Sequence, residues 1–263
     1  MRRKLLALFM LLVLTFTFVS TSDIGVYANP DTRCYSWYFK KVDNGEQPPD
    51  TPELKFIEKY NGKWIDRNAD ENKKVIYLTF DAGYENGNIE KTLNVLKEKQ
   101  VCGTFFILEN LVKRDPQIVK RMHDEGHTIA NHTCKHPDMT KISDKSIFKA
   151  QLTGLEKICK EKLDIEISKY FRPPEGKISE LAMSYLDSMG YKTIFWSFAH
   201  ADWDNNKQPD PKKSIDNIIS HTHNGMVLLL HPTSSTNAEI LPELIDKWRE
   251  MGYTFGDADM LFR

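Results

Sequence analysis

From Lys74 onward, short apolar runs rich in β-branched and aromatic residues alternate with longer amphipathic segments. The short runs have the length of buried strands, and the longer segments carry the periodicity of helices. Strands are predicted at residues 74–81, 103–108, 128–131, 169–172, 192–196, 226–231 and 253–255. Helices are predicted between them at 89–99, 116–125, 143–163, 179–189, 211–223 and 240–251. The pattern therefore indicates repeated βα units.

Repeated βα units require a parallel sheet with helices outside it. About seven such units within this span predict an α/β fold in which the strands form a closed or nearly closed (β/α) barrel. In that architecture functional residues gather at the carboxyl ends of the strands. The sequence can therefore be searched for reactive side chains at those positions.

The first residues differ from the rest of the chain. Three basic residues, Arg2, Arg3 and Lys4, precede an apolar run at residues 5–19. A more polar stretch follows the run and ends at the small residue Ala28. This order is typical of a signal peptide covering residues 1–28, which predicts an exported protein. The alternative is a segment that stays attached as a membrane anchor.

Residues 29–73 combine several aromatic residues with turn formers and show little periodicity. Exposed aromatic side chains need a surface to bury them. We therefore expect this segment to be an N-terminal extension packed on the barrel domain, which covers residues 74–263.

Charge and cysteine content restrict the partners and the chemistry. The 36 basic and 37 acidic side chains nearly cancel, and no dense basic block is present, so nucleic acid is not an expected partner. The four cysteines form no recognisable disulfide framework, and a domain of this size can be stable without one. They are interpreted as buried free thiols: Cys34, Cys102, Cys134 and Cys159.

Reactive side chains stand at the ends of four predicted strands. Asp81, Arg172 and His231 each end a strand, and His132 follows another directly. Taken singly, such an Asp is often a helix cap and such a His an ordinary polar residue. Their shared position predicts that they meet on one face of the barrel.

Further residues fit the same site. His132 and His136 are four residues apart, which on a single helical turn directs both imidazoles to one side and can chelate a divalent metal. Arg172 is positioned to hold Asp81 ionised, although an exposed ion pair worth little is the alternative. Asp202 can orient His231, and the aromatic residues around it suit stacking on a sugar.

Five ordered motifs in this sequence resemble those of the polysaccharide deacetylases of carbohydrate esterase family 4, the NodB-homology domain. The motifs are Thr79-Phe80-Asp81, His132-x-x-x-His136, Arg172-Pro173-Pro174, Asp202-Trp203 and Leu228-x-Leu230-His231. The resemblance spans about residues 74–255. It implies a distorted (β/α) barrel and a divalent metal, commonly zinc.

The resemblance also implies roles. Asp81 is expected to be the general base, secured by Arg172, and His231 the general acid, tuned by Asp202. His132 and His136 are expected to be metal ligands. The substrate-binding residues are expected to be Trp203, Pro174 and Tyr84.

Two positions depart from the family pattern. Ala82 occupies the place of a second aspartate that completes the metal site, so metal binding is expected to be weak unless water or another carboxylate, such as Glu85, substitutes. Ser197 stands where many members carry an aspartate.

These departures, with the sequence around Asp81 and the aromatic extension, resemble the sporulation branch that deacetylates N-acetylmuramic acid in peptidoglycan on the way to muramic δ-lactam in the spore cortex. The resemblance implies a peptidoglycan glycan strand as the partner, and a location in the cell wall, the medium or the forespore intermembrane space. The protein is expected to be a monomer that contacts the membrane only through the signal segment, if that segment is not cleaved. Two alternatives remain: a deacetylase for N-acetylglucosamine in peptidoglycan or chitin-like glycan, and a catalytically decayed glycan-binding domain.

Overall fold

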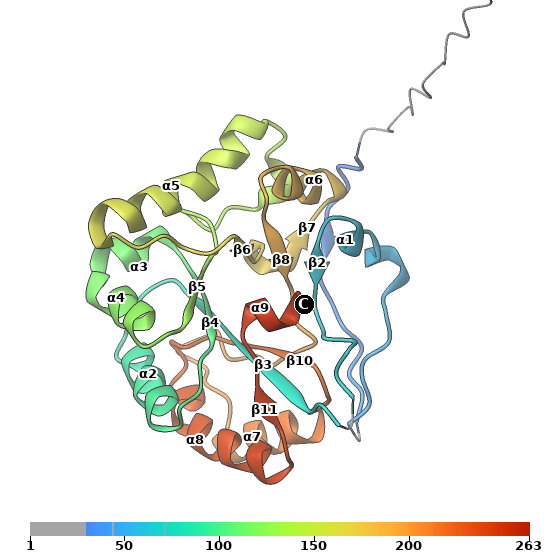
Figure 1. The fold of residues 1–263 in the computed structure, drawn as a ribbon, viewed down its shortest axis with the longest axis vertical. Coiled ribbons are helices and arrows are strands. Elements are labelled where there is room, and N and C mark those ends of the chain that lie inside the picture. Colours follow the sequence, from blue (N-terminus) through green and yellow to red (C-terminus); the bar gives the residue numbers. More distant parts are fainter. Residues whose placement is uncertain (1–29, 44, 71) are drawn as a thin grey trace, which may run out of the picture.

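A computed structural model describes residues 30–43, 45–70 and 72–263, which form a parallel sheet curved into a barrel with helices around it (Figure 1). The predicted signal segment, residues 1–28, lies outside the described residues. The sheet follows the order β2-β8-β6-β5-β4-β3-β10-β9, and its named pairings are all parallel. Its central strands are β3 (Val75–Ala82), β4 (Thr104–Ile107), β5 (Thr128–Asn131), β6 (Tyr170–Phe171), β8 (Lys192–Ile194) and β10 (Met226–Leu230). The predicted parallel barrel is confirmed.

Short strands complete the sheet at its margins. β2 (Gly62–Lys63) pairs with β8, and β9 (Phe198–Ala199) pairs with β10, so these two form the ends of the strand path. β11 (Thr254–Phe255) pairs with the first residues of β3, whose later residues pair with β4. A bridge between Ile65 and Met226 joins the chain beyond β2 to β10. The barrel is thus nearly closed, with β2 supplied by the N-terminal segment.

The helices cover the outside of the sheet. They are α2 (Asn88–Glu98), α3 (Glu109–Arg114), α4 (Pro116–Asp124), α5 (Lys145–Leu163), α6 (Glu180–Ser188), α7 (Pro211–Ser220) and α8 (Ser235–Glu250). α8 begins five residues earlier than predicted, at Ser235 rather than residue 240, because the Ser234 side chain accepts a hydrogen bond from the Asn237 backbone N–H and caps the helix. No described helix has both the length and the apolarity needed to cross a membrane.

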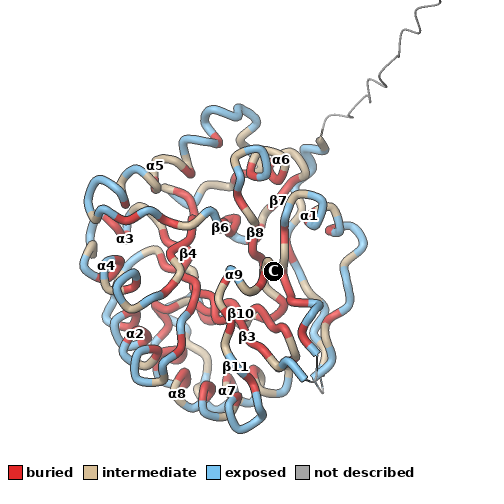
Figure 2. Tube along the Cα trace, in the orientation of Figure 1, coloured by how far each residue is buried: buried red, intermediate tan, exposed pale blue. Residues whose placement is uncertain are grey.

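Side-chain alternation along β3 divides the core into two layers. Leu78 and Phe80 face the helices, whereas Val75 and Tyr77 face the barrel interior. α9 (Ala258–Leu261) packs into that interior beside Val75 and Tyr77, which lie near the start of β3 (Figure 2). The amino end of the barrel is therefore filled, and the carboxyl end is available for a site.

The N-terminal segment packs along the barrel. Its strand β1 (Tyr35–Ser36) pairs antiparallel with β7 (Lys177–Ile178). Trp37 stacks on Phe195 with ring centroids 4.5 Å apart, and its indole N–H donates to the Trp196 carbonyl at 2.9 Å. The 3-10 turn η1 (Pro52–Leu54) and helix α1 (Phe56–Lys59) follow, before β2.

All four cysteines are free thiols, as predicted, but the expectation that all are buried is wrong. Cys34 and Cys102 are exposed, Cys134 is half-buried and Cys159 is buried. Cys34 lies in the N-terminal segment, and Cys102 lies in the turn before β4, where the chain is at the surface.

Candidate active site

Asp81 lies near the carboxyl end of β3 and is paired with Arg172. The guanidinium Nη1 donates to Asp81 Oδ1 at 2.9 Å, and the Arg172 side chain is completely buried. Its remaining donors reach the Thr79 hydroxyl and the carbonyls of Ile194 and Phe195. Strands β3, β6 and β8, with the residue after β8, therefore fix this guanidinium beside the carboxylate.

The Asp81–Arg172 pair is a buried interaction, not the exposed ion pair considered as an alternative. Burial has the largest single effect and raises the pKa of Asp81, but the charge and hydrogen bond of Arg172, together with the neighbouring His132 and His231, outweigh it and hold that pKa below the ordinary value. Oδ1 is occupied by Arg172, so Oδ2 is the oxygen that remains for chemistry. Asp81 is therefore ionised at neutral pH.

His132 and His136 lie together after β5, with ring centroids 5.0 Å apart. The helical turn predicted for them is wrong: the segment is a loop in which Thr133 and His136 have φ angles of 78° and 56°, in the left-handed region. The Asn131 side chain accepts from the Thr133 N–H, and the Thr133 hydroxyl accepts from the His136 N–H. These bonds fold the loop so that the two rings meet.

His132 faces Asp81 with its unprotonated nitrogen. Its Nδ1 donates to the Arg172 carbonyl at 2.8 Å, and burial lowers its pKa to about 4, so the ring is neutral and Nε2 carries a lone pair. That nitrogen lies 3.6 Å from Asp81 Oδ2. This nitrogen is the atom of His132 that is free to bind a metal ion or to accept a hydrogen bond.

The residues around His132 and His136 do not complete a three-ligand metal site. The described part of the chain contains no group of three His, Cys, Asp or Glu arranged to hold a metal ion. Ala82 is fully buried in the layer beneath the helices. Glu85, the suggested substitute, accepts hydrogen bonds from the Gly87 and Glu90 N–H groups at the start of α2.

His231 follows β10 and is bound by Asp202. The His231 Nδ1 donates to Asp202 Oδ1 at 2.7 Å, and the His231 backbone N–H donates to Oδ2 at 2.8 Å. Burial lowers the pKa of His231, but the hydrogen bond and charge of Asp202 raise it above the ordinary value. His231 is therefore suited to carry a proton in a buried site.

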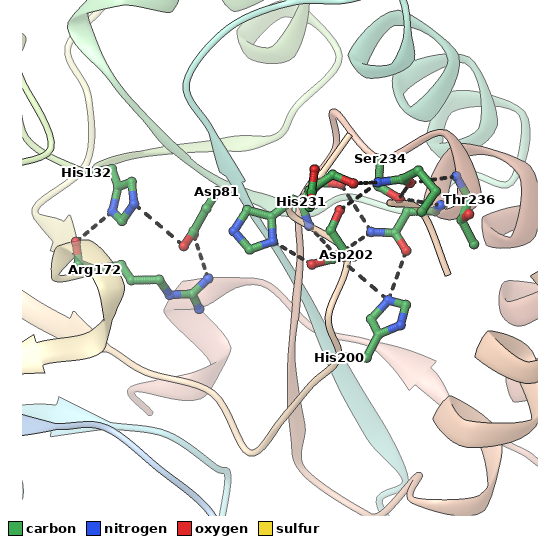
Figure 3. A network of polar contacts seen from close by, with 11 residues as sticks. Asp81, His132, Arg172, His200, Asp202, His231, Ser234 and Thr236 are labelled. Carbon is green, nitrogen blue, oxygen red and sulfur yellow. Dashed lines mark hydrogen bonds and ion pairs between the residues drawn. The ribbon is translucent and has the colours of Figure 1, made fainter. Parts of the chain in front are cut away.

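A cavity of about 450 Å³ opens between these groups. Asp81, His132, His136 and His231 all line it, so the structure brings together the carboxylate and the three imidazoles that the sequence placed on one face. Figure 3 shows the His231 ring between Asp81 and Asp202. Trp196 and Trp203 add aromatic walls.

The three residues expected to bind substrate lie in different places. Trp203 lines the cavity and is 63% exposed, as a stacking surface requires. Tyr84 is exposed at the surface, where its hydroxyl accepts a hydrogen bond from Asn205. Pro174 is buried, and its neighbours Glu175 and Gly176 form the cavity wall.

Three polar residues near the site make contacts that were not predicted from the sequence. His200 lines the cavity, and Asn237 at the start of α8 binds Asp202. His200 could have been recognised as a site residue from the sequence, because it lies two residues before Asp202. Ser197 hydrogen-bonds the buried His223 ring and the Val227 N–H, which accounts for a serine at this position.

The fold and site together define a hydrolase of the β/α barrel class, with an ionised carboxylate and a carboxylate-bound imidazole facing one cavity. Comparison with known proteins identifies the family. The profile of the polysaccharide deacetylase family matches residues 68–194. The N-acetylmuramic acid deacetylase PdaA of Bacillus subtilis is 41% identical over 229 residues, covering 86% of this chain and 85% of PdaA.

Solved structures agree with the sequence comparison. The structure of Bacillus subtilis PdaA, a family 4 carbohydrate esterase, has a TM-score of 0.82 at 38% identity and covers 88% of this chain and 98% of that one. A family 4 carbohydrate esterase from Bacillus anthracis has a TM-score of 0.72 at 36% identity, covering 89% and 98%. The chain belongs to the polysaccharide deacetylase family, carbohydrate esterase family 4. Deacetylases of this family are metal-dependent hydrolases of carbon–nitrogen bonds.

Proposed function

We propose that this protein removes the acetyl group from N-acetylmuramic acid in peptidoglycan, a step towards muramic δ-lactam in the spore cortex. The substrate is inferred from the 41% identity to PdaA, which extends across most of both chains. The cavity supports the reaction class, because it presents a base and an acid to one space. Peptidoglycan lies outside the cytoplasmic membrane, in agreement with the export expected from residues 1–28.

Asp81 is the general base of the proposed reaction. A water molecule beside Asp81 donates a hydrogen bond to Oδ2, the carboxylate oxygen that Arg172 does not occupy, and its oxygen lone pair is free for attack. Arg172 holds Oδ1 and fixes the direction of the carboxylate. Asp81 takes one proton as the water oxygen bonds to the acetamide carbon.

His231 is the general acid. The attack produces a tetrahedral intermediate, and protonated His231 donates from Nε2 to the amide nitrogen as the carbon–nitrogen bond breaks. Asp202 on Nδ1 stabilises the imidazolium until that transfer. Acetic acid and the sugar amine leave, and return of the Asp81 proton to His231 through solvent restores both groups. Acetic acid then ionises and the amine takes up its proton.

A substrate panel tests this proposal. Purified protein is incubated with intact peptidoglycan, peptide-free glycan and chitooligosaccharides, and mass spectrometry locates the new amine. Amines on muramic acid are expected. Amines only on glucosamine would show that the sugar is wrong, and glycan retention without acetate release, with or without zinc, would indicate a binding domain instead.

For the metal, we propose that zinc binds His132 and His136 weakly. Catalytic zinc sites have three protein ligands, and Ala82 supplies none. Four-ligand sites bind zinc with roughly 10–16 kcal/mol, and half of that, about 5–8 kcal/mol, corresponds to a Kd of about 1–200 µM. The two proton transfers of the proposed reaction are made by Asp81 and His231 and not by the zinc site.

Isothermal titration calorimetry with zinc measures this affinity. The variant His136→Ala is expected to lose the binding, whereas the matched control His123→Ala, which alters an exposed imidazole on α4, is expected to bind as the wild type does. Nanomolar binding, or binding that survives His136→Ala, would contradict the two-ligand site.

A further inference from the structure

The carboxylate of Asp202 accepts hydrogen bonds from three donors while being almost fully buried, at 1% exposure. Oδ1 binds the His231 imidazole, and Oδ2 binds the His231 backbone N–H. The third donor is Nδ2 of Asn237, which lies 2.5 Å from Oδ2. A buried carboxylate needs such donors to remain ionised.

The surroundings of Asn237 fix the orientation of its amide. Nδ2 lies near Asp202 Oδ2 and also 3.1 Å from the His231 carbonyl oxygen. Both are acceptors, so the NH₂ group must face them and Oδ1 must face the other way. Oδ1 lies 3.0 Å from Nε2 of His200, which must therefore carry the hydrogen. Each residue therefore donates a hydrogen bond to the next: His200 donates to Asn237, and Asn237 donates to Asp202.

We propose that Asn237 and His200 are positioning residues for the proton donor His231, acting through Asp202. His200 holds the Asn237 amide, Asn237 holds Asp202 Oδ2, and Asp202 thereby keeps Oδ1 in line with the His231 ring. This inference rests on the proposed role of His231 as general acid. Sequence spacing alone does not reveal it, because Asn237 is 35 residues from Asp202 in the chain.

The alternative is that Asn237 only anchors helix α8. Other bonds already anchor that helix, because the Ser234 hydroxyl accepts from the Asn237 backbone N–H at 3.1 Å and donates to Gln208. The Gln208 amide in turn binds the Asp202 and Asp204 carbonyls, which folds the loop before α7. The side-chain amide of Asn237 is therefore free of the helix cap and directed at Asp202.

The charges that face His231 come from three parts of the fold. They are Asp202 in the loop before α7, Asp81 on β3 and Arg172 after β6. His200 also lies 3.8 Å from Asp202 Oδ2. Of these groups, Asp202 is the one bonded directly to the His231 ring, so its position has the strongest influence on that proton.

Three variants isolate the chain of hydrogen bonds. Asn237→Leu removes the donor to Asp202 with little change in volume, and His200→Leu removes the donor to Asn237. His200→Gln retains an N–H at nearly the position of Nε2 and serves as the rescue. Ser234→Ala is the matched control, since it weakens the α8 cap but leaves the Asn237 side chain in place.

The pH dependence of kcat is measured for each variant, together with KM and with the NMR titration of the His231 ring. Without Asn237 or His200, Asp202 Oδ1 is expected to move out of line with the His231 ring, which weakens the hydrogen bond that holds the imidazolium proton. The alkaline inflection and the His231 pKa are then expected to move down by about one pH unit, with kcat falling about tenfold and KM nearly unchanged. His200→Gln is expected to restore the wild-type profile. Ser234→Ala is expected to lower Tm without moving the inflection.

The outcomes separate this inference from the proposed function. An active wild type whose inflection and His231 titration do not move in Asn237→Leu and His200→Leu would overturn the positioning role. The same shift in Ser234→Ala would show that the effect comes from anchoring of helix α8, and it would also overturn the positioning role. A wild type without acetate release would refute the proposed function, while the NMR titration would still decide whether Asn237 and His200 act on His231.

Discussion

At the scale of single residues, the site depends on how Asp81 stays charged while buried. Arg172 has no exposed surface and distributes its donors among Asp81, Thr79 and two backbone carbonyls. Removing one partner of such a pair leaves an uncompensated buried charge, at a cost of about 3–5 kcal/mol. The same bonds that stabilise the barrel therefore prepare the base.

The two pKa shifts predict how activity depends on pH. In the proposed reaction, the active form has Asp81 ionised and His231 protonated. Because the pKa of Asp81 is lowered, the base stays ionised until the pH falls below 3.8. Because the pKa of His231 is raised, the acid stays protonated to a pH above 6.5 and is lost as pH rises further.

The pH profile of kcat for acetate release checks this expectation. Activity should be constant between the two limbs and fall through an alkaline inflection above 6.5. An alkaline limb below 6, or activity that rises throughout the range from about 5 to 9, would contradict the assignment of His231 as acid.

At the scale of elements, the N-terminal segment is part of the barrel wall. β2 extends the sheet beside β8, and β1 pairs with β7 just after Gly176 in the cavity wall. Gly176 has φ 66°, and a Cβ there would lie 2.8 Å from the Trp196 ring and 2.9 Å from Trp37 Cβ. The segment therefore supports one side of the substrate cavity from behind.

Trp37 is buried between that segment and the barrel, and replacing it should destabilise the whole fold. Trp37→Ala removes the stacking on Phe195 and the bond to the Trp196 carbonyl, at an expected cost of about 3–5 kcal/mol. Urea denaturation measures the loss. Tyr38→Ala, at a neighbouring residue that is 50% exposed, is the control and should change stability by about 0.5 kcal/mol or less.

The sequence predicted the long elements and missed the short ones for physical reasons. β10 is a continuous apolar run and β3 is apolar except for Thr79 and Asp81, so length and apolar composition identify them. β2 and β9 have two residues each, too few to show any period, and they exist only through pairing with β8 and β10. α3 was missed because it begins directly after β4 and has six residues.

At the scale of the whole molecule, barrel topology assembles the site. Strand ends that are distant in the chain meet at one rim, so the meeting of Asp81, Arg172 and His231 could be predicted from the sequence. The His132–His136 loop could not, because its left-handed turns depend on bonds from Asn131 and Thr133. The same holds for Asn237, whose role depends on how α8 docks beside Asp202.

The assignment of Asp81 as the base of an N-deacetylase is checked by measuring acetate release from peptide-free peptidoglycan glycan by the Asp81→Asn variant. The substitution leaves the Arg172 charge without its counter-ion, so Tm should fall, but the amide oxygen of Asn still accepts from Arg172 and melting curves should show a protein that is folded at the assay temperature. The account predicts a loss of kcat of about 10²–10⁴-fold. Acetate release by a folded Asp81→Asn protein within about threefold of the wild type would contradict it.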